Sequence, residues 1–209
     1  MWTWRYTGDD PGIRLFTSAL GANAPMTFRP GQRVLEVGCC ESDWLTRAAA
    51  AWPDTAFVGM DWRASDSLTT VKGDVLDRHL FPAQAFDGIV SLSAMEHIGL
   101  GHYADDPRNV DGDSRAIANC RRWLRPGGWL YFDVPYDPRG YRVEHTEYRA
   151  YDEAALHDRL WAPFLSNAIW RDTWRRYADA GDSRRLVDRP TTQADDRVRY
   201  YVALCWLRP

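Results

Sequence analysis

The sequence predicts an α/β protein with a doubly wound, mostly parallel sheet, and two strand ends carry this prediction. Residues 34–37 are apolar except for Glu36 and lead through Gly38 into small and polar residues, which is typical of a buried strand that turns sharply into a helix. Further along, residues 57–61 form a second apolar segment that ends in Asp61. The turn would present unpaired helix N–H groups to a ligand, and Asp61 could accept both hydroxyls of a ribose. Together they predict a nucleoside-containing cofactor.

The spacing of the glycines narrows the choice of cofactor. A dinucleotide site uses G-x-G-x-x-G, because the pyrophosphate needs bare backbone at each glycine. Counting from Gly38, the second and third of these positions hold Cys40 and Asp43, a thiol and a second negative charge. NAD and FAD are therefore disfavoured, and a nicotinamide oxidoreductase remains a minor alternative.

Helices are predicted over residues 11–20, 43–52 and 113–124, because each carries an apolar stripe at helical spacing. The Pro-Gly-Gly at residues 126–128 ends the third of them. Each stripe is expected to bury its helix against the rest of the fold.

Two irregular segments are predicted, over residues 99–112 and 136–148. The first is rich in Gly, Asp, Asn and Pro, and it is too polar for core and too long for a simple turn. After the second, Asp152 is expected to cap a helix, with Tyr151 and Leu156 in hydrophobic staple positions.

From about residue 31 to its C-terminus the chain resembles class I S-adenosylmethionine (SAM) methyltransferases. The matching segments, in the family's order, are the E-x-G of Glu36 to Gly38, then Asp61, residues 71–76, residues 86–93 and residues 121–130. The resemblance implies one domain over residues 1–209, a Rossmann-like sheet of seven strands with the last strand antiparallel, and a helical cover over residues 1–30. The last two strands are expected at residues 164–170 and 198–206, with an exposed connection over residues 178–196.

The resemblance also implies SAM as the cofactor. Asp61 would bind the ribose, Trp62 would lie against the adenine, and Asp74 would take the adenine amino group. Cys40 and Ser42 stand where glycines are commoner in the family, but both side chains are small enough for the turn. The implied cofactor-binding residues are Glu36, Gly38, Cys39, Asp61, Trp62, Gly73, Asp74, Val75, Ser91 and Leu92.

A narrower likeness begins after the fourth strand. Residues 96–103, with Asp111-Gly112-Asp113 after them, resemble a group of methyltransferase-like domains of unknown function that carry an EHxGLGxY motif. That likeness implies a fold and a cofactor but supplies no substrate.

His97 is the first candidate for a catalytic base, because it follows the strand that faces the methyl donor in the family and an imidazole titrates near pH 6.5. Glu96 could orient His97 or replace it. In the alternative interpretation, the Glu-His pair only stabilises the loop by hydrogen bonds. The segments 99–112 and 136–148 are expected to form the acceptor pocket as active-site loops. The substrate-binding candidates are His102, Tyr103, Tyr136, Arg142 and His145.

Composition sets limits on partners. The net charge is −3 with acids and bases interspersed, so no electrostatic footprint for nucleic acid is indicated.

No apolar segment approaches the roughly 20 residues of a membrane span, and no signal-peptide core is present, which favours a cytoplasmic protein. The four cysteines lack metal-ligand spacing, so no metal site is expected. The 11 tryptophans include candidates for a substrate cavity or a homodimer contact.

These features predict a SAM-dependent methyltransferase acting on a small-molecule acceptor, by O-methylation. The alternative from another class is a SAM-fold binding or interaction protein without methyl transfer. The two hypotheses predict the same fold and differ in whether the protein transfers a methyl group.

Overall fold

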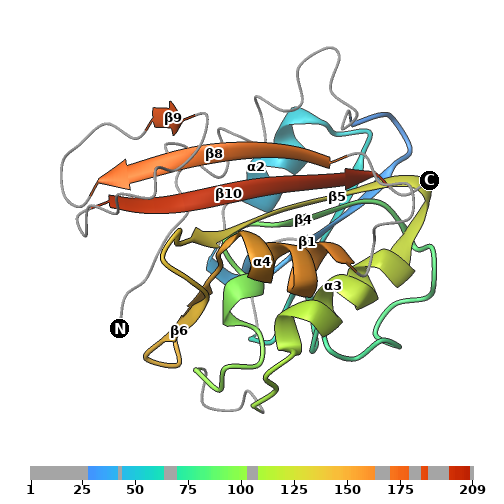
Figure 1. The fold of residues 1–209 in the computed structure, drawn as a ribbon. Coiled ribbons are helices and arrows are strands. Elements are labelled where there is room, and N and C mark those ends of the chain that lie inside the picture. Colours follow the sequence, from blue (N-terminus) through green and yellow to red (C-terminus); the bar gives the residue numbers. More distant parts are fainter. Residues whose placement is uncertain are drawn as a thin grey trace.

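The computed structural model describes residues 28–41, 44–63, 70–102 and 108–162, and the backbone of residues 170–178, 185–187 and 198–207 (Figure 1). The predicted helix at residues 11–20 and most of the predicted cover at residues 1–30 lie outside this part of the chain. So do Ser42, Asp43 and Tyr103.

The core of the fold is an eight-stranded sheet with strand order β3-β2-β1-β4-β5-β10-β8-β9. Its strands are β1 (Arg33–Val37), β2 (Ala56–Asp61), β3 (Thr70–Lys72), β4 (Phe86–Ser91), β5 (Leu124–Tyr136), β8 (Trp170–Ala178), β9 (Arg185–Val187) and β10 (Val198–Leu207). Strands β1 to β5 are parallel to their neighbours within this set. Strand β10 runs antiparallel to both β5 and β8. The carboxyl ends of β1 to β5 therefore meet at one edge of the sheet.

The number of strands differs from the expected seven. Strand β9 pairs with β8 at the edge of the sheet, within the stretch predicted to be an exposed connection. Three residues of edge pairing give too weak a sequence pattern to separate from a loop.

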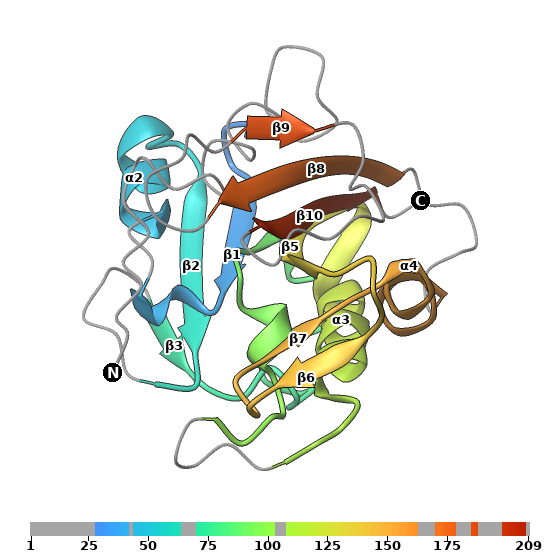
Figure 2. The same ribbon diagram turned by 60° about the vertical axis from the view of Figure 1, so that its left-hand side comes forward.

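Helices cover both faces of the sheet. Figure 2 shows α2 (Trp44–Ala51) on one side of β1 and β2, and α3 (Gly112–Trp123) with α4 (Glu153–Ala155) on the other. The strands alternate accordingly, because Leu35 packs in the cluster that contains α3 and Val34 packs in the cluster that contains α2. The core is thus two apolar layers, one on each face.

The helices predicted at residues 43–52 and 113–124 agree with α2 and α3 to within one residue at each end. The apolar stripe of α3, including Ala116, Ile117, Cys120 and Trp123, is fully buried. The Asp152 side chain accepts a hydrogen bond of 2.7 Å from the Ala155 N–H, which confirms the predicted cap. After α4 the chain continues as a π-helical segment, η3 (Leu156–Trp161).

The segment 71–76 contains the end of the third strand, as the resemblance implied. Strand β3 ends at Lys72, and the Asp74 carboxylate then accepts the Leu76 N–H at 2.8 Å and forms a turn. One predicted segment was partly wrong. The segment predicted as irregular contains β6 (Arg142–Glu144), which pairs with β7 (Tyr148–Ala150) as a hairpin. The turn between them places His145 and Thr146 at positive φ, without the Asn-Gly or Asp-Gly that signals a hairpin.

Within the described residues, no helix combines the length and the apolar character needed to cross a membrane.

Candidate active site

The turn after β1 is packed directly on the turn after β4. Gly38 has φ +84°, and a Cβ placed there would lie 2.4 Å from the Cβ of Ala94. The Gly38 N–H donates to the Met60 carbonyl at 2.9 Å, which ties the turn to β2. A valine at position 38 would strain the backbone and collide with Ala94, so it would disturb the fold as well as a ligand.

Asp61 connects the ends of β1 and β2. It is buried, and one carboxylate oxygen (Oδ2) accepts the Cys40 N–H at 3.0 Å. The other oxygen (Oδ1) accepts the backbone N–H of Arg63 at 2.8 Å and its Nε at 3.3 Å. Each carboxylate oxygen has about two acceptor positions. One ribose hydroxyl therefore fits Oδ2, whereas the predicted pairing with both hydroxyls requires the half-buried Arg63 side chain to release Oδ1.

The thiol in this turn is protonated. Cys39 is fully buried, and burial together with the negative charges of Glu36 and Asp61 raises its pKa to about 12. Burial likewise raises the pKa of the Cys120 thiol to about 12. The Cys39 sulfur in this turn is therefore neutral.

The end of β3 lies against the end of β2. The Gly73 N–H donates to the Asp61 carbonyl at 2.9 Å, and Asn119 of α3 donates to the Val75 carbonyl at 2.8 Å. Asp74, between these two anchors, is half-buried, as is Trp62. The structure thus brings the predicted ribose and adenine residues to neighbouring positions at the same edge of the sheet.

Ser91 is the candidate residue at the end of β4. It is fully buried at the end of β4, and its hydroxyl makes no hydrogen bond within the described part of the chain. A buried polar group without a partner in a native structure calls for an explanation, such as a ligand or water. This hydroxyl and the open position on Asp61 both fit a polar cofactor at the strand ends.

Glu96 and His97 lie in the short helical turn η2 (Met95–His97) after β4. The Nδ1 of His97 lies 2.6 Å from the Glu147 carbonyl oxygen. Because a carbonyl only accepts, Nδ1 carries the proton and the lone pair of the neutral ring lies on Nε2. The Nε2 is 3.8 Å from Glu96 Oε1, and the ring of His102 is centred 6.3 Å from that of His97. The structure thus brings together three of the predicted residues.

The Glu96 carboxyl is almost completely buried, with 1% of the residue exposed. Burial raises its pKa well above the usual range, and the charge of Asp133 raises it further. The charge of Arg149 acts in the opposite direction but does not cancel these effects. Burial therefore favours the protonated, neutral form of Glu96, which favours His97 over Glu96 as a base.

Replacing Glu96 with glutamine is expected to remove a pH dependence of stability. The pKa of Glu96 is higher in the folded state than in the unfolded chain, so above its ordinary range the unfolded chain binds fewer protons. Stability contributed by the protonated group is then lost as pH rises, by up to about 1.4 kcal/mol per pH unit. Thermal unfolding of Glu96→Gln and the parent protein between pH 4.5 and 8 measures this, and the variant should gain relative stability toward pH 8.

Glu153→Gln is the matched control, since Glu153 is exposed in the first turn of α4. Its melting temperature should follow that of the parent across the pH range. A constant difference between Glu96→Gln and the parent would contradict a buried, neutral Glu96.

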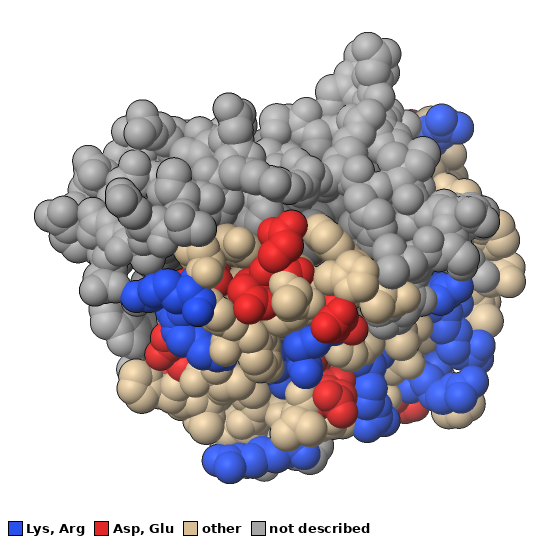
Figure 3. All heavy atoms as spheres, in the orientation of Figure 1, with Lys and Arg blue, Asp and Glu red and all other residues tan. Residues whose placement is uncertain are grey.

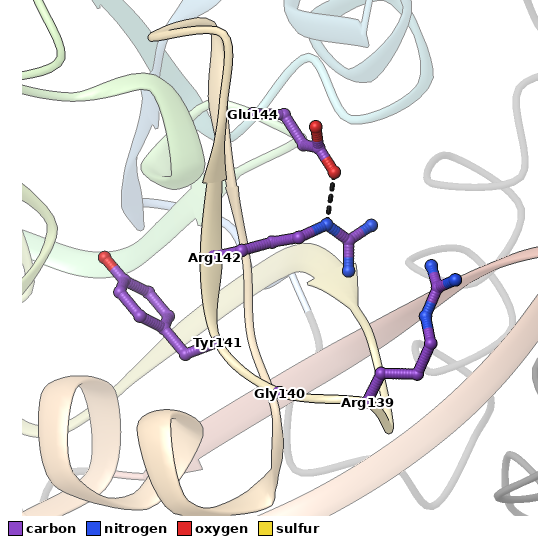
Figure 4. A pocket seen from close by; sticks show the side chains of 5 residues that line it. All are labelled: Arg139, Gly140, Tyr141, Arg142 and Glu144. Carbon is purple, nitrogen blue, oxygen red and sulfur yellow. Dashed lines mark hydrogen bonds and ion pairs between the residues drawn. The ribbon is translucent and has the colours of Figure 1, made fainter.

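Arg142 faces a surface hollow of about 460 Å³ on the β6 hairpin (Figure 4). Its guanidinium pairs with Glu144 and with the buried carboxylate of Asp137. Arg139 also donates to Asp137, at 2.8 Å. The hollow is lined by Arg139, Gly140, Tyr141, Arg142 and Glu144. It therefore offers donors, acceptors and an aromatic ring in one place.

The remaining substrate candidates are not gathered there. The His145 side chain is 88% exposed at the tip of the hairpin, and Tyr136 is half-buried at the end of β5. Tyr103 lies outside the described residues. Over the part of the chain that the structure describes, no group of three His, Cys, Asp or Glu residues could hold a metal ion.

Sequence reasoning missed a buried polar network beneath this site. Asp113 and Arg149 are both fully buried, and Asp113 accepts hydrogen bonds from Tyr151 and Arg159. Arg149 lies on β7, a strand that the sequence pattern did not predict. The only available signal was Asp113 in the Asp-Gly-Asp that follows the EHxGLGxY motif.

Comparison with known proteins agrees with this architecture. The chain matches a methyltransferase domain family over residues 12–187. Over 117 residues it is 33% identical to ribosomal RNA large subunit methyltransferase E of Acidithiobacillus ferrooxidans, a match that covers 51% of this chain and 53% of that enzyme. The chain spans at most about half the length of the curated relatives it matches.

Two solved structures share the fold. The 1,6-didemethyltoxoflavin-N1-methyltransferase of Burkholderia thailandensis, with bound 1,6-didemethyltoxoflavin and S-adenosylhomocysteine, aligns with a TM-score of 0.63 at 18% identity, over 96% of this chain and 79% of that one. The N-methyltransferase NodS of Bradyrhizobium japonicum, in complex with S-adenosylhomocysteine, aligns with a TM-score of 0.53 at 16% identity, over 97% and 90% of the two chains.

The chain therefore belongs to the methyltransferase domain family. Its domain is that of a SAM-dependent methyltransferase, and SAM is the cofactor of the family.

Proposed function

We propose that this protein transfers a methyl group from SAM to a hydroxyl of a small-molecule acceptor. The observation that carries the proposal is the packing of Gly38 against Ala94, which brings the ends of β1 and β4 together. Asp61, the buried Ser91 hydroxyl and the η2 turn are gathered at the same edge of the sheet. Ligands of open α/β sheets bind in this position.

We assign the strands to the family's seven-stranded sheet as follows. Strand β10 is antiparallel to β5, and β8 is antiparallel to β10, so β8 runs in the same direction as β5. We take β8 as the sixth strand and β10 as the seventh and last, with β9 as an addition at the edge. The cofactor side of the sheet then lies over β1 to β4.

In this proposal the residues at the strand ends hold the cofactor. Asp61 accepts a ribose hydroxyl at Oδ2, Trp62 lies against the adenine, and Asp74 accepts the adenine amino group. The cradle for the amino-acid end consists of Glu36, Gly38 and Cys39, and the remaining contacts come from Gly73, Val75, Ser91 and Leu92.

The cofactor, when bound, supplies a methyl group that its sulfonium charge has already activated. The protein's part is to align an acceptor, which can account for roughly 7–11 kcal/mol of the barrier, and to remove a proton. His97 Nε2 is our candidate base, since the carbonyl of Glu147 holds the other nitrogen. Its contribution is expected to be about 10²–10⁴-fold.

A small acceptor is favoured by the surface. On the face shown in Figure 3, basic side chains of the described residues occur in separate groups with acidic ones among them. A nucleic-acid substrate would favour a continuous basic stripe. The hollow at Arg142, lined by charged side chains and Tyr141, supports a polar or aromatic small molecule. Because one relative is a ribosomal RNA methyltransferase, RNA is the competing class of acceptor.

Replacing Asp61 with alanine is expected to weaken SAM binding by about 10- to 150-fold. The variant loses one charge-assisted hydrogen bond to the ribose, worth about 1.5–3 kcal/mol. Isothermal calorimetry with SAM, S-adenosylhomocysteine and NAD measures the affinities. SAM binding without any turnover on acceptor panels would favour the binding-module alternative, and NAD binding alone would reject the assignment.

Asp87→Ala is the matched control for this experiment. Asp87 is an aspartate near the opposite end of β4, where it accepts the Arg33 N–H at 2.7 Å and pairs with Arg125. Its loss should leave SAM affinity unchanged. Equal affinities of the Asp61 variant and the parent would refute the role of Asp61.

A further inference from the structure

Arg149 holds the backbone on both sides of His97. Its side chain is fully buried, and its Nη1 donates to the Ile98 carbonyl at 2.7 Å and to the Glu96 carbonyl at 3.3 Å. Two residues earlier, the Glu147 carbonyl accepts the His97 Nδ1–H. One short stretch of chain, residues 147–149, therefore contacts both the ring and the backbone of His97.

The same guanidinium reaches the far end of the loop that follows. Its Nη2 donates to the carbonyls of Asn109 and Val110, each at 3.4 Å. At Gly99 an added Cβ would lie 2.4 Å from the Asn109 carbonyl oxygen, so the two ends of the loop are in close contact. Arg149 thus joins the beginning and the end of the predicted acceptor loop.

An arginine suits this position for chemical reasons. Its planar fork of five donors satisfies several carbonyls at once, whereas a lysine ammonium is a single point of charge. Asp113, whose Oδ2 lies 3.7 Å from Nε, supplies the opposite charge in the interior. A buried charge that is bonded to several fixed partners has one favourable position. The carbonyl groups bonded to it are therefore held in place as well.

We propose that residues 147–149 position His97, with the Glu147 carbonyl selecting the ring tautomer and Arg149 fixing the turn that carries the ring. The role of His97 in catalysis rests on the proposed function above. Arg149 is then a positioning residue, because it acts through His97 and touches neither the cofactor nor the acceptor. The consequence is that Nε2 stays the unprotonated nitrogen of the neutral ring.

The tautomer is tested on the unaltered protein. Nitrogen-15 NMR of the histidine rings, recorded above the pH range in which imidazole titrates, distinguishes a proton on Nδ1 from one on Nε2. His97, identified by the signal missing in His97→Ala, should carry the proton on Nδ1. A proton on Nε2 would overturn the proposal, and this measurement needs no variant of Arg149 to fold.

Arg149→Lys tests the second half of the proposal. The His97 ring signals should shift toward a mixture of tautomers, because lysine cannot hold both flanking carbonyls. Arg159→Met is the matched control, since Arg159 bonds the same Asp113 and Val110, at 2.6 Å each, through the same kind of side chain. His97 should keep its signals there. Unchanged signals in Arg149→Lys, or equal shifts in both variants, would contradict a positioning role.

The test separates this inference from the proposed function. If His97→Ala retains full methyl transfer, the catalytic role of His97 is lost while the ring measurement still decides how His97 is held. If the ring carries its proton on Nε2 but His97→Ala is inactive, His97 remains the proposed base, and the proposed positioning of His97 by residues 147–149 is wrong.

Discussion

Replacing His97 with alanine is expected to lower kcat by about 10²–10⁴ while leaving SAM affinity nearly unchanged. The variant loses a base but keeps the strand ends that hold the cofactor, so alignment of the acceptor still supports some reaction. The parent rate should also rise with pH through the titration of the imidazole, and the variant should lose this limb. Transfer of labelled methyl from SAM to the best hydroxyl acceptor measures both effects.

His157→Ala is the matched control for this variant. His157 lies in η3, where its side chain is 49% exposed and pairs with Asp158. It should retain the parent rate and pH profile. Full activity of His97→Ala would instead mean that alignment alone is sufficient, and His97 would then have the loop-stabilising role of the alternative interpretation.

Replacing Asp113 with asparagine is expected to destabilise the fold by about 3–5 kcal/mol, because it leaves buried arginine charge without its partner. Asp113 is fully buried at the start of α3 and accepts Arg159 Nη2 at 2.6 Å and the Tyr151 hydroxyl at 2.9 Å. Arg149 is the second cation beside it. Asparagine keeps the shape of the side chain and removes only its charge. Urea unfolding followed by tryptophan fluorescence measures the loss.

Asp111→Asn provides the comparison within the same turn. The Asp111 side chain is 64% exposed and lies 3.6 Å from Arg159 Nη2, so its loss should cost less than about 1 kcal/mol. Similar losses for the two variants would show that the buried network is not what stabilises this side of the sheet.

Features that depend on near neighbours in the chain could be predicted from the sequence. The first strand and its glycine turn, the buried stripe of α3 and the Asp152 cap all follow from patterns within a few residues. A cap bond joins residues three apart, and an apolar stripe repeats every three or four positions, so both are visible in the sequence. The resemblance to a known family then extended these local patterns to a fold and a cofactor.

The chemistry of the candidate site was decided only by tertiary structure. Asp61 accepts a backbone N–H from Cys40, 21 positions away, and Arg149 contacts Glu96 across 53 positions. The raised pKa of Glu96 depends on burial and on Asp133 of β5. The β6–β7 hairpin was not predicted because its turn lacks glycine. For the same reason the contacts of residues 147–149 with His97 were not predicted. Such interactions depend on distance and burial in space, and the order of residues along the chain carries no direct record of either.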